Sequence, residues 1–380
     1  MEKRLCEICE IQAGGTPSRS NNEYWLGGGI PWVKISDIKG KYIDSTEEYI
    51  TQLGLDNSSA KVFPKGTILY TIFATLGETG ILSIDAATNQ AIAGLRIVDE
   101  EVIPEYLYFF LCSLKDYVNN IGRGVAQNNI NLGILRNLTI SIPTKETQES
   151  IARKLNKVEE LIALRKKQLQ KLDDLVKARF VEMFEAGVFP SHDLFKLILD
   201  GTGLSYGIVQ PGDDGTGDMG VLRPVDLVDG HISMKQIKYI DRSIGDSYQR
   251  TQLNGHELLI TVRGTTGITA LTDERFAGMN VTRGIAVIRY DEKKVNPVYL
   301  NCYLNTTESQ RYIQEHTRGA TLQQINIADL RVQKIPVPSM QMQERFAEFA
   351  LQVDKSKLSI QQSLEKLETL KQSLMQQYFG

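Results

Sequence analysis

Hydrophobic and polar residues follow two different spacings along this chain. In residues 1–144 and again in residues 187–338, short apolar runs are bounded by Gly, Asn, Asp and Pro. That pattern is typical of strands joined by turns. The clearest runs are GTILYTI from Gly66 and GHELLITV from Gly255. We therefore expect each of these two globular parts to contain a β-sheet.

Each globular part also contains a segment with helical spacing. PEYLYFFLCSLKDYVNNI (104–121) and PVYLNCYLNTTESQRYIQEH (297–316) both begin with Pro. Proline is well tolerated at the first turn of a helix, because its missing N–H has no partner there. We expect one helix over each segment, so that both globular parts are mixed α and β.

Between and after the globular parts, apolar residues change to a spacing of three and four. Residues 145–186 and 339–380 keep that spacing over about 40 positions, which corresponds to a helix of ~60 Å. Thr144 and Ser339 each follow a proline and are natural N-caps. The first of these helices should end before Gly187. The chain therefore alternates two globular parts with two long helices.

The apolar seams of the two long helices are interrupted by charge at different positions. Arg165 and Arg179 interrupt the first, and Lys357 and Lys371 interrupt the second. A heptad-like seam needs a helical partner. Two different seams in one chain favour pairing with each other over self-association, and repeats related by a two-fold axis would make that pair antiparallel. The alternative is that each helix lies on its own globular part.

The second half of the chain repeats the first, with an offset that grows from 189 to 195 residues. IPWVKISDI matches GVLRPVDLV, which pairs Asp37 with Asp226. NQAIAGLRI from Asn89 matches NVTRGIAVI from Asn280, and GRGVAQNNINLGILRNLTISIP matches TRGATLQQINIADLRVQKIPVP. Because order and spacing persist over nearly the whole chain, we infer a duplicated unit.

Composition places the chain among soluble globular proteins. It has 380 residues, 42% hydrophobic and 23% charged, which suits two or three domains with full cores. No apolar run approaches the ~18 residues of a membrane span, and no charged-then-apolar leader opens the chain. The four cysteines do not form a disulfide framework, so we expect a cytoplasmic protein.

The net charge of −3 does not by itself indicate nucleic-acid binding. None of the four segments is strongly basic. A DNA-binding surface on this chain would therefore be a local patch, or most phosphate contacts would come from a partner.

Motifs for catalysis are missing from the sequence. There is no GxxxxGK followed by Ser or Thr, and the four histidines form no HExxH pair. Cys6 and Cys9 make one CxxC without a second pair. The DGTG segments at Asp200 and Asp214 follow no strand-to-helix turn, which argues against a nucleotide or S-adenosylmethionine loop. We predict no catalytic, metal-binding or cofactor-binding residue in this chain.

One segment imitates a methyltransferase signature. NPVY from Asn296 is similar to the Asn-Pro-Pro-Tyr/Phe motif of adenine methyltransferases. Its counterpart in the first half is IPEY from Ile103, which lacks the Asn that the chemistry requires. What the two copies share is Pro and Tyr at the start of a helix, so we interpret the segment as structural.

The remaining polar clusters suit binding. Tight loops end strands at 73–77 and 263–267, and amides cluster in AQNNIN (126–131) and LQQIN (322–326). Arg, Asn and Gln can form paired hydrogen bonds with guanine and adenine edges, while Lys, Ser and Thr commonly hold phosphates. We predict DNA contacts from exposed residues of both parts: Lys34, Ser36, Lys39, Thr75, Arg123, Gln127 and Asn128 in the first, and Arg223, Arg263, Thr265, Thr266, Arg283, Arg318 and Gln323 in the second.

The chain resembles the target-recognition domains of type I restriction–modification specificity subunits. The resemblance rests on EIQAGGTPSRSNNEYWLGGGIPWVKISDI, GTILYTIFATLG, TNQAIAGL, MNVTRGIAVIR and INLGILRNLTISIP, in this order, and it covers essentially the full length. The family often has Gly-Thr-x-Gly after the strand. The second half keeps this motif at 264–267, whereas the first has Ala74-Thr75-Leu76-Gly77, which leaves the backbone conformation of the first loop open.

The resemblance implies partners and a fold. Such a subunit assembles with two modification subunits, which bind S-adenosylmethionine and methylate adenine N6, and added restriction subunits translocate and cleave DNA. Each recognition domain reads part of a bipartite double-stranded target, and the helices set the gap. We accordingly expect an α+β fold with a pseudo-two-fold repeat: recognition domains at 1–144 and 187–338, and antiparallel coiled-coil spacer helices at 145–186 and 339–380.

Two other hypotheses stay open on the sequence. One is a non-DNA interaction protein with two ligand-binding domains on a coiled-coil strut, which predicts weak, salt-insensitive DNA association. The other is a self-sufficient methyltransferase, which requires that the isolated chain binds S-adenosylmethionine. The outer faces of the long helices are candidate docking surfaces for protein partners, and their charged residues include Lys154, Lys157, Glu159, Glu160 and Lys166.

Overall fold

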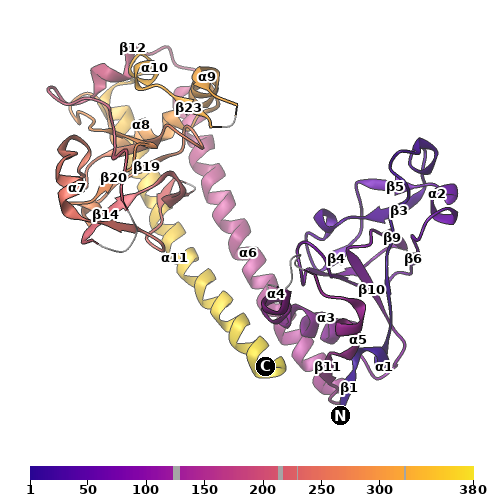
Figure 1. Cartoon of the computed structure of the whole chain (residues 1–380). Helices are drawn as coiled ribbons and strands as arrows, with labels where there is room; N and C mark the ends of the chain where they lie inside the picture. The colour runs from indigo at the N-terminus through magenta and orange to yellow at the C-terminus, as the bar shows by residue number, and fades with distance from the viewer. Residues whose placement is uncertain (123–128, 213–216, 229, 321) are drawn as a thin grey trace. The chain divides into compact units, whose positions relative to one another are not determined.

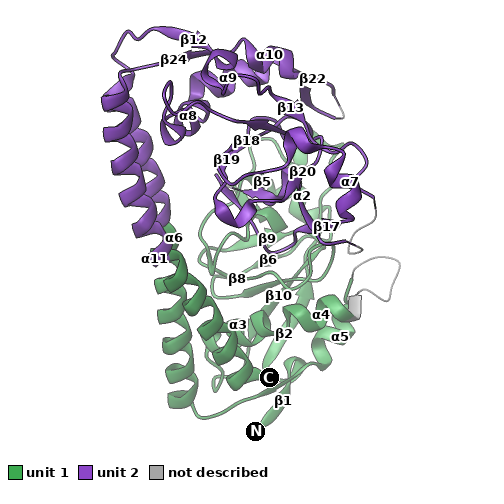
Figure 2. Cartoon of the chain, turned by 90° about the vertical axis from the view of Figure 1, so that its left-hand side faces the viewer, with its two compact units in different colours: residues 1–167, 361–380 green, residues 168–360 purple. Residues whose placement is uncertain are grey.

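The structure is a computed structural model that describes residues 1–122, 129–212, 217–228, 230–320 and 322–380 (Figure 1). The chain forms two compact units, residues 1–167 with 361–380 and residues 168–360 (Figure 2). Each unit therefore contains one globular part and one end of each long helix. No helix among the described residues is both long and apolar enough to cross a bilayer.

Two sheets form most of the first globular part. The five-stranded sheet has the order β2 (Cys9–Ala13), β10 (Ile92–Ile97), β7 (Ile68–Thr71), β8 (Thr79–Leu82) and β4 (Tyr42–Ile43). The four-stranded sheet has the order β5 (Glu48–Ile50), β3 (Ile30–Val33), β9 (Ala86–Thr88) and β6 (Val62–Phe63). Strands pair antiparallel except β4 with β8 and β3 with β9. The apolar run from Gly66 becomes β7, whose four residues are all buried.

Short elements complete the first globular part. β1 (Glu2–Arg4) pairs with β11 (Thr139–Ser141), directly before the first long helix. The other elements are α1 (Leu5–Ile8), η1 (Asn22–Tyr24), η2 (Ile35–Asp37), α2 (Gln52–Asp56), α3 (Pro104–Ser113), α4 (Lys115–Gly122) and α5 (Leu132–Asn137).

The second globular part has the same kind of sheets. Its four-stranded sheet has the order β13 (Ser205–Tyr206), β21 (Ile285–Ile288), β18 (Leu258–Thr261) and β19 (Thr269–Leu271). A three-stranded sheet has the order β17 (Lys238–Ile240), β14 (Met219–Leu222) and β20 (Asn280–Val281), with β14 and β20 parallel. Two-stranded pairs are β12 (Ser191–Asp193) with β24 (Lys334–Pro336), β15 (Leu227–Val228) with β16 (His231–Ile232), and β22 (Thr317–Arg318) with β23 (Gln324–Ile325).

The helices of the second part are short. They are η3 (Leu194–Leu197), η4 (Pro224–Asp226), α7 (Arg242–Asp246), η5 (Gln249–Thr251), η6 (Glu274–Phe276), α8 (Pro297–Leu304), α9 (Thr307–His316) and α10 (Ile327–Arg331).

The single helix expected over each Pro-initiated segment is wrong, because each segment forms two helices. In the second segment Thr306 has an extended backbone, and its hydroxyl accepts the N–H of Ser309 at 3.3 Å. A capping threonine of this kind starts a new helix. In the first segment α3 ends at Ser113, and the N–H of the next residue, Leu114, donates to the carbonyl of Leu111. Apolar spacing alone does not show such breaks.

The two long helices are present as predicted. α6 covers Lys145–Phe184 and α11 covers Met340–Phe379. The Thr144 hydroxyl accepts the N–H of Thr147 at 3.4 Å, in agreement with its predicted role as N-cap. The predicted helix boundaries therefore agree with the structure to within a residue or two.

A buried glutamine fastens each long helix to its globular part. The Oε1 of Gln148 accepts the N–H of Ile103 at 3.0 Å, and the Oε1 of Gln343 accepts the N–H of Asn296 at 2.8 Å. In both residues Nε2 donates to the carbonyl of the proline five positions earlier. These bonds tie the first turn of each long helix to the start of α3 or α8, so the helix direction follows the globular part.

The two long helices contact each other inside each unit. In unit 1, Lys371 lies 2.7 Å from Glu159, while Lys166 lies 3.4 Å from Glu368. In unit 2, Lys357 lies 2.6 Å from Asp173. In unit 1 the residue numbers rise along α6 as they fall along α11, so these segments run in opposite directions. Lys357 and Lys371, the two charges in the second seam, are thus partners of carboxylates on α6.

The far end of each long helix packs into the other globular part. Phe379, at the end of α11, lies with its ring centroid 5.2 Å from that of Tyr106 in unit 1. Phe184, at the end of α6, lies 4.9 Å from Tyr299 in unit 2. Tyr106 and Tyr299 are both buried on the first helix after the sheet. This packing is why each compact unit includes segments of both long helices.

Candidate nucleic-acid interface

Equivalent tight loops follow the central strands of the two sheets. After β7, the hydroxyl of Thr71 accepts the N–H seven residues on at 2.8 Å, and Thr261 after β18 does the same at 2.9 Å. The N–H of Gly77 and that of Gly267 donate to the carbonyls of these threonines at 3.0 and 2.8 Å. These bonds close both loops in the same way.

The first loop has a left-handed residue at the position of the missing glycine. Ala74 has a φ of 64°, close to the 85° of Gly264 at the matching position. Among the described residues, Ala74 is the one non-glycine with positive φ. A left-handed alanine costs about 1 kcal/mol relative to the ordinary conformation. The first loop therefore adopts the left-handed backbone despite the missing glycine.

Three loops of the second part lie next to one another. The N–H of Val262 donates to the carbonyl of Gly284 at 2.7 Å, and the N–H of Gly264 donates to the carbonyl of Gln323 at 2.9 Å. Arg263 also forms an isolated antiparallel bridge with Gln324. The segments 262–264, 283–284 and 323–324 are thus held together by backbone bonds, and the structure brings Arg263, Thr265, Arg283 and Gln323 into one region.

The arginines of this region have free charges. Arg283 is exposed and Arg263 is half-buried, and no carboxylate of the described residues lies within ion-pair distance of either. Thr265 and Gln323 are also exposed. Arg318 is 71% exposed and lies 3.6 Å from Asp329 at its nearest approach, a long ion pair in solvent. These five side chains can all be reached by a ligand.

Two predicted contacts of the second part fit a structural role. Thr266 was expected to be exposed, which is wrong: it is only 4% exposed, and its hydroxyl lies 3.0 Å from that of Thr317. The guanidinium of Arg223 donates to Asp226 at 3.1 Å and to the carbonyl of Gln236 at 2.5 Å. A half-buried arginine with these partners holds its own turn together.

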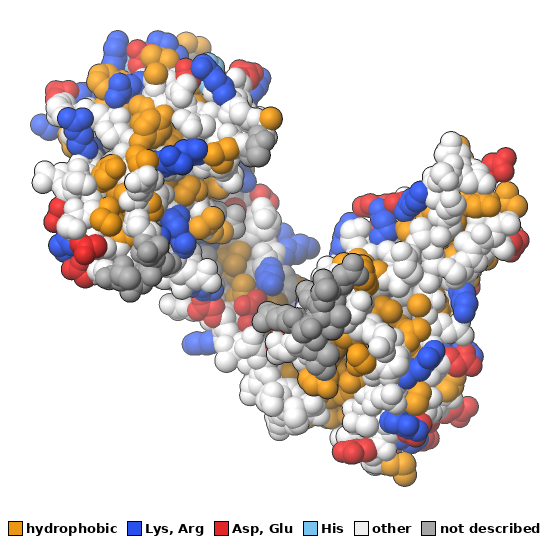
Figure 3. Space-filling view, in the orientation of Figure 1, with side chains coloured by type: hydrophobic (Ala, Val, Ile, Leu, Met, Phe, Trp, Pro, Cys, Tyr) orange, Lys and Arg blue, Asp and Glu red, His pale blue; other side chains and the backbone are white. Residues whose placement is uncertain are grey.

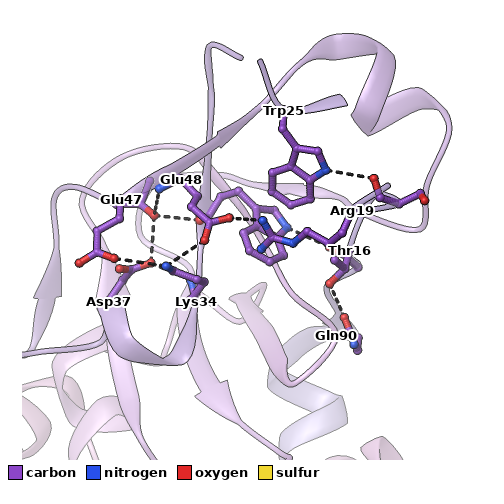
Figure 4. A network of polar contacts seen from close by, with 12 residues as sticks. Thr16, Arg19, Trp25, Lys34, Asp37, Glu47, Glu48 and Gln90 are labelled. Carbon is purple, nitrogen blue, oxygen red and sulfur yellow. Dashed lines mark hydrogen bonds and ion pairs between the residues drawn. The ribbon is translucent and has the colours of Figure 1, made fainter. Parts of the chain in front are cut away.

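The predicted lysines of the first part are already paired. The Nζ of Lys34 lies 2.9 Å from Glu48 and 3.2 Å from Glu47 (Figure 4). The hydrogen bond to Glu48, and then that to Glu47, raises the pKa of Lys34. Lys39 is exposed and lies 3.6 Å from Glu47. Both lysines therefore lie beside carboxylates, although Glu48 is shared with Arg19.

Of the other residues predicted in the first part, Ser36 and Thr75 are exposed. Arg123, Gln127 and Asn128 lie outside the described residues. The next residue, Asn129, bridges to Phe73 in the same way as Gln324 bridges to Arg263. Position 73, which is an arginine in the second part, is therefore an exposed phenylalanine in the first.

Sequence reasoning missed a stacked arginine in the first part. Arg19 places its guanidinium carbon 3.7 Å from the ring centre of Trp25 and 4.8 Å from that of Trp32. Its Nη1 donates to Glu48 at 2.5 Å (Figure 4). The presence of two tryptophans close to an arginine in the sequence was the available signal. These contacts hold the Arg19 side chain in place.

The predicted pairing of Asn89 with Asn280 is wrong. Val33 pairs with Thr88, and its counterpart Leu222 pairs with Val281, so the offset at this point is 193 rather than 191. Asn280 is fully buried and corresponds to a buried alanine, whereas Asn89 accepts the N–H of its own loop at Ala91. The two Asn residues match in sequence, but the strand pairing shows that they do not occupy equivalent positions.

Two thiols of the first part, those of Cys9 and Cys112, are poor candidates for chemistry. Burial raises the pKa of Cys9 to about 12, so its thiol stays protonated at neutral pH. Burial likewise raises the pKa of Cys112 to about 11. In the part of the chain that the structure covers, no group of three or more His, Cys, Asp and Glu could hold a metal ion.

Charge is dispersed over the surface. On the face drawn in Figure 3, Lys and Arg side chains of each unit are scattered among apolar and acidic ones. This agrees with a net charge of −3 for the chain. The unpaired arginines at 263 and 283 are therefore a local feature of unit 2.

Comparison with known proteins identifies the family. The model of the type I restriction modification DNA specificity domain matches residues 1–174 and 216–371, and the chain belongs to this family. It is 33% identical over 187 residues to the Type I restriction enzyme MjaIX specificity subunit of Methanocaldococcus jannaschii, covering 48% of this chain and 43% of that protein. It is 21% identical over 384 residues to the EcoBI specificity subunit of Escherichia coli, covering 92% of this chain and 79% of that protein.

Solved structures share the fold over the full chain. The S subunit of a type I restriction-modification system from M. genitalium superposes with a TM-score of 0.55 at 14% identity, covering 100% of this chain and 96% of that chain. A chain from a study of complex assembly and conformational transition of the type I R-M system gives a TM-score of 0.57 at 18% identity, covering 100% and 97%. The mixed α/β architecture with long helices is therefore that of the family.

Proposed function

We propose that this chain is the DNA-specificity subunit of a type I restriction–modification enzyme. Each globular part would read one half of a bipartite double-stranded target. The observation that carries this proposal is the pair of unneutralised arginines, Arg263 and Arg283, on neighbouring loops of unit 2. Unpaired cations on neighbouring loops favour an anionic ligand, and DNA supplies both phosphates and guanine edges.

The long helices would serve as the spacer between the reading parts. We interpret α6 and α11 as an antiparallel coiled coil that relates two copies of one unit by a pseudo-two-fold axis. Support comes from the ion pairs Lys371–Glu159 and Lys357–Asp173, and from the matched buried glutamines at 148 and 343. Because the charged residues in the apolar seam of α11 form ion pairs with α6, pairing of the two helices is favoured over self-association of either helix.

The catalytic steps would belong to partner subunits. In this proposal two modification subunits bind S-adenosylmethionine and methylate adenine N6, and restriction subunits add translocation and cleavage. The chain itself would bind DNA and position these partners in the cytoplasm, without cofactor or metal of its own. Arg263 and Arg283 lack an ion-pair partner among the described residues, but the chain as a whole is nearly neutral. This is consistent with partner subunits that supply many of the contacts with DNA phosphates.

Sequencing methylated adenines tests the proposal. DNA from cells with and without this gene should differ in methylation at one bipartite motif. Exchanging residues 1–144 for the same part of another such subunit should change one half of the motif and leave the other half and the gap intact. If no methylation depends on the gene, the proposal is wrong. If both halves change together, the model of two separate readers is wrong.

A further inference from the structure

One loop in each unit occupies the same place in the sheet framework. The loop between β9 and β10 in unit 1 corresponds to the loop between β20 and β21 in unit 2. The N–H of Gly15 donates to the carbonyl of Thr88 at 2.9 Å, and the N–H of Ile208 donates to the carbonyl of Val281 at 2.8 Å. The donor and the acceptor in unit 2 each have a residue number 193 higher than their counterparts in unit 1. The pairing of β2 with β10 and of β13 with β21 gives the same difference.

At this offset Gln90 corresponds to Arg283. Both residues are exposed, and both are two positions beyond the carbonyl that anchors the loop. The loops therefore present one polar side chain each at a matching position. The two side chains differ in the hydrogen-bonding pattern that they offer: an amide in the first unit and a guanidinium in the second.

In unit 1 a second residue orients the amide. The hydroxyl of Thr16 donates a hydrogen bond to the Oε1 of Gln90 (Figure 4). This bond distinguishes the two ends of the amide and leaves the second lone pair of Oε1 and both hydrogens of Nε2 for a ligand. No described residue accepts a hydrogen bond from that Nε2. An oriented amide with a free donor and a free acceptor matches a ligand that offers both.

In unit 2 the backbone fixes the position of the arginine. The N–H of Arg283 donates to the carbonyl of Ile208 at 2.9 Å, and the adjacent Gly284 accepts the N–H of Val262. Other exposed arginines of this unit, such as Arg242 and Arg275, lie 3.0 and 2.6 Å from a carboxylate. Arg283 has no such partner among the described residues, so its five donors remain available.

Resting on the proposed DNA function, we propose that Gln90 and Arg283 are equivalent base-reading positions, one for each half of the target. Gln90 would bind adenine, with Nε2 donating to N7 and Oε1 accepting from N6. Arg283 would bind guanine by donating to O6 and N7. These are the paired hydrogen bonds that Gln and Arg form with base edges in the major groove. One change of side chain on a shared framework would thus give the two halves different sequences.

The chemistry favours base edges over phosphates. A phosphate offers only hydrogen-bond acceptors, so it could bind the Nε2 of Gln90 but not its Oε1. Orienting Oε1 by the bond from Thr16 would therefore not help Gln90 to bind a phosphate. Adenine offers a donor and an acceptor side by side, which an oriented amide matches. For Arg283 the two alternatives are separated by a lysine substitution, because lysine keeps the charge for a phosphate and loses the planar pair of donors.

The experiment uses the full chain assembled with its modification subunits. A plasmid library randomised in both half-sites is methylated, and methylated adenines are mapped by sequencing. Arg283→Lys should lose discrimination for guanine at one position of the second half-site by about ten- to a hundredfold. Gln90→Glu should lose the preference for adenine at one position of the first half-site by a similar factor. Arg275→Lys, an exposed and paired arginine of the same unit, is the control and should leave the motif unchanged.

The outcomes separate this inference from the proposed function. If Arg283→Lys lowers methylation equally on all sequences, or leaves the motif intact, Arg283 does not read a base and the inference is wrong, while the wild-type motif still supports the proposed function. If Gln90→Glu changes the second half-site, the assignment of one position to each half is wrong. If the wild-type assembly methylates without sequence preference, the proposed function itself fails.

Discussion

Replacing the buried glutamine at the start of α6 should destabilise unit 1. Gln148 is fully buried and makes three hydrogen bonds, with the N–H of Ile103 and the carbonyls of Glu101 and Pro143. Leucine has a similar volume but bonds to none of them. A buried polar group without a partner costs roughly 1–3 kcal/mol. Since a carbonyl has a second lone pair and tolerates the loss better, we expect Gln148→Leu to lower the free energy of unfolding by about 3 kcal/mol.

Urea denaturation of the purified chain measures this loss, and amide hydrogen exchange localises it. The N–H of Ile103 should exchange faster in the variant, because its acceptor is gone. Glu149→Leu places the same new side chain at the exposed neighbouring position and should change stability by less than 0.5 kcal/mol, roughly the effect of an ordinary surface substitution. If Gln148→Leu unfolds at the wild-type urea concentration with unchanged exchange at Ile103, then these hydrogen bonds do not fasten α6 to α3, and the reasoning is refuted.

Two further predictions concern backbone strain and the paired helices. Gly264→Ala should lower the free energy of unfolding by about 1 kcal/mol, since an added Cβ meets no atom within 4 Å and only the left-handed backbone opposes it. The reverse change, Ala74→Gly, should not destabilise the chain. If thermal melting shows equal losses of stability for these two variants, this account is contradicted. Replacing Lys357 and Asp173 by alanine, singly and together, should give a coupling energy of about 1 kcal/mol in a double-mutant cycle, because the lysine is only 12% exposed. If the two losses of stability are additive, this ion pair does not help to join the helices.

Long-range order in this chain could be predicted from residue spacing. A run of about 40 positions with apolar residues every three or four can only bury its stripe as a helix, so the bounds of α6 and α11 agreed with prediction. The strands β7 and β18 were predicted for a similar reason, since four consecutive buried residues leave a compact signal. These features depend on local sequence, which is why they were accessible.

Exposure of single side chains could not be predicted in the same way. Thr265 and Thr266 are neighbours of identical type, and yet one is exposed while the other is buried against Thr317. Arg223 is basic and near a turn, and only the structure shows that its guanidinium donates to Asp226 and to a carbonyl. Which partner a polar group finds depends on what the fold brings beside it.

The order of apolar and polar residues, taken alone, determined that this chain contains two similar mixed α/β parts and two long helices, and its motifs led to the correct family. Only the tertiary structure decided that Val33 pairs with Thr88 and Leu222 with Val281. It also decided that Lys34 and Lys39 lie beside carboxylates, while Arg263 and Arg283 have none within ion-pair distance among the described residues. The physical reason is that periodicity reports burial along one element, whereas strand register and charge pairing are contacts between elements distant in sequence.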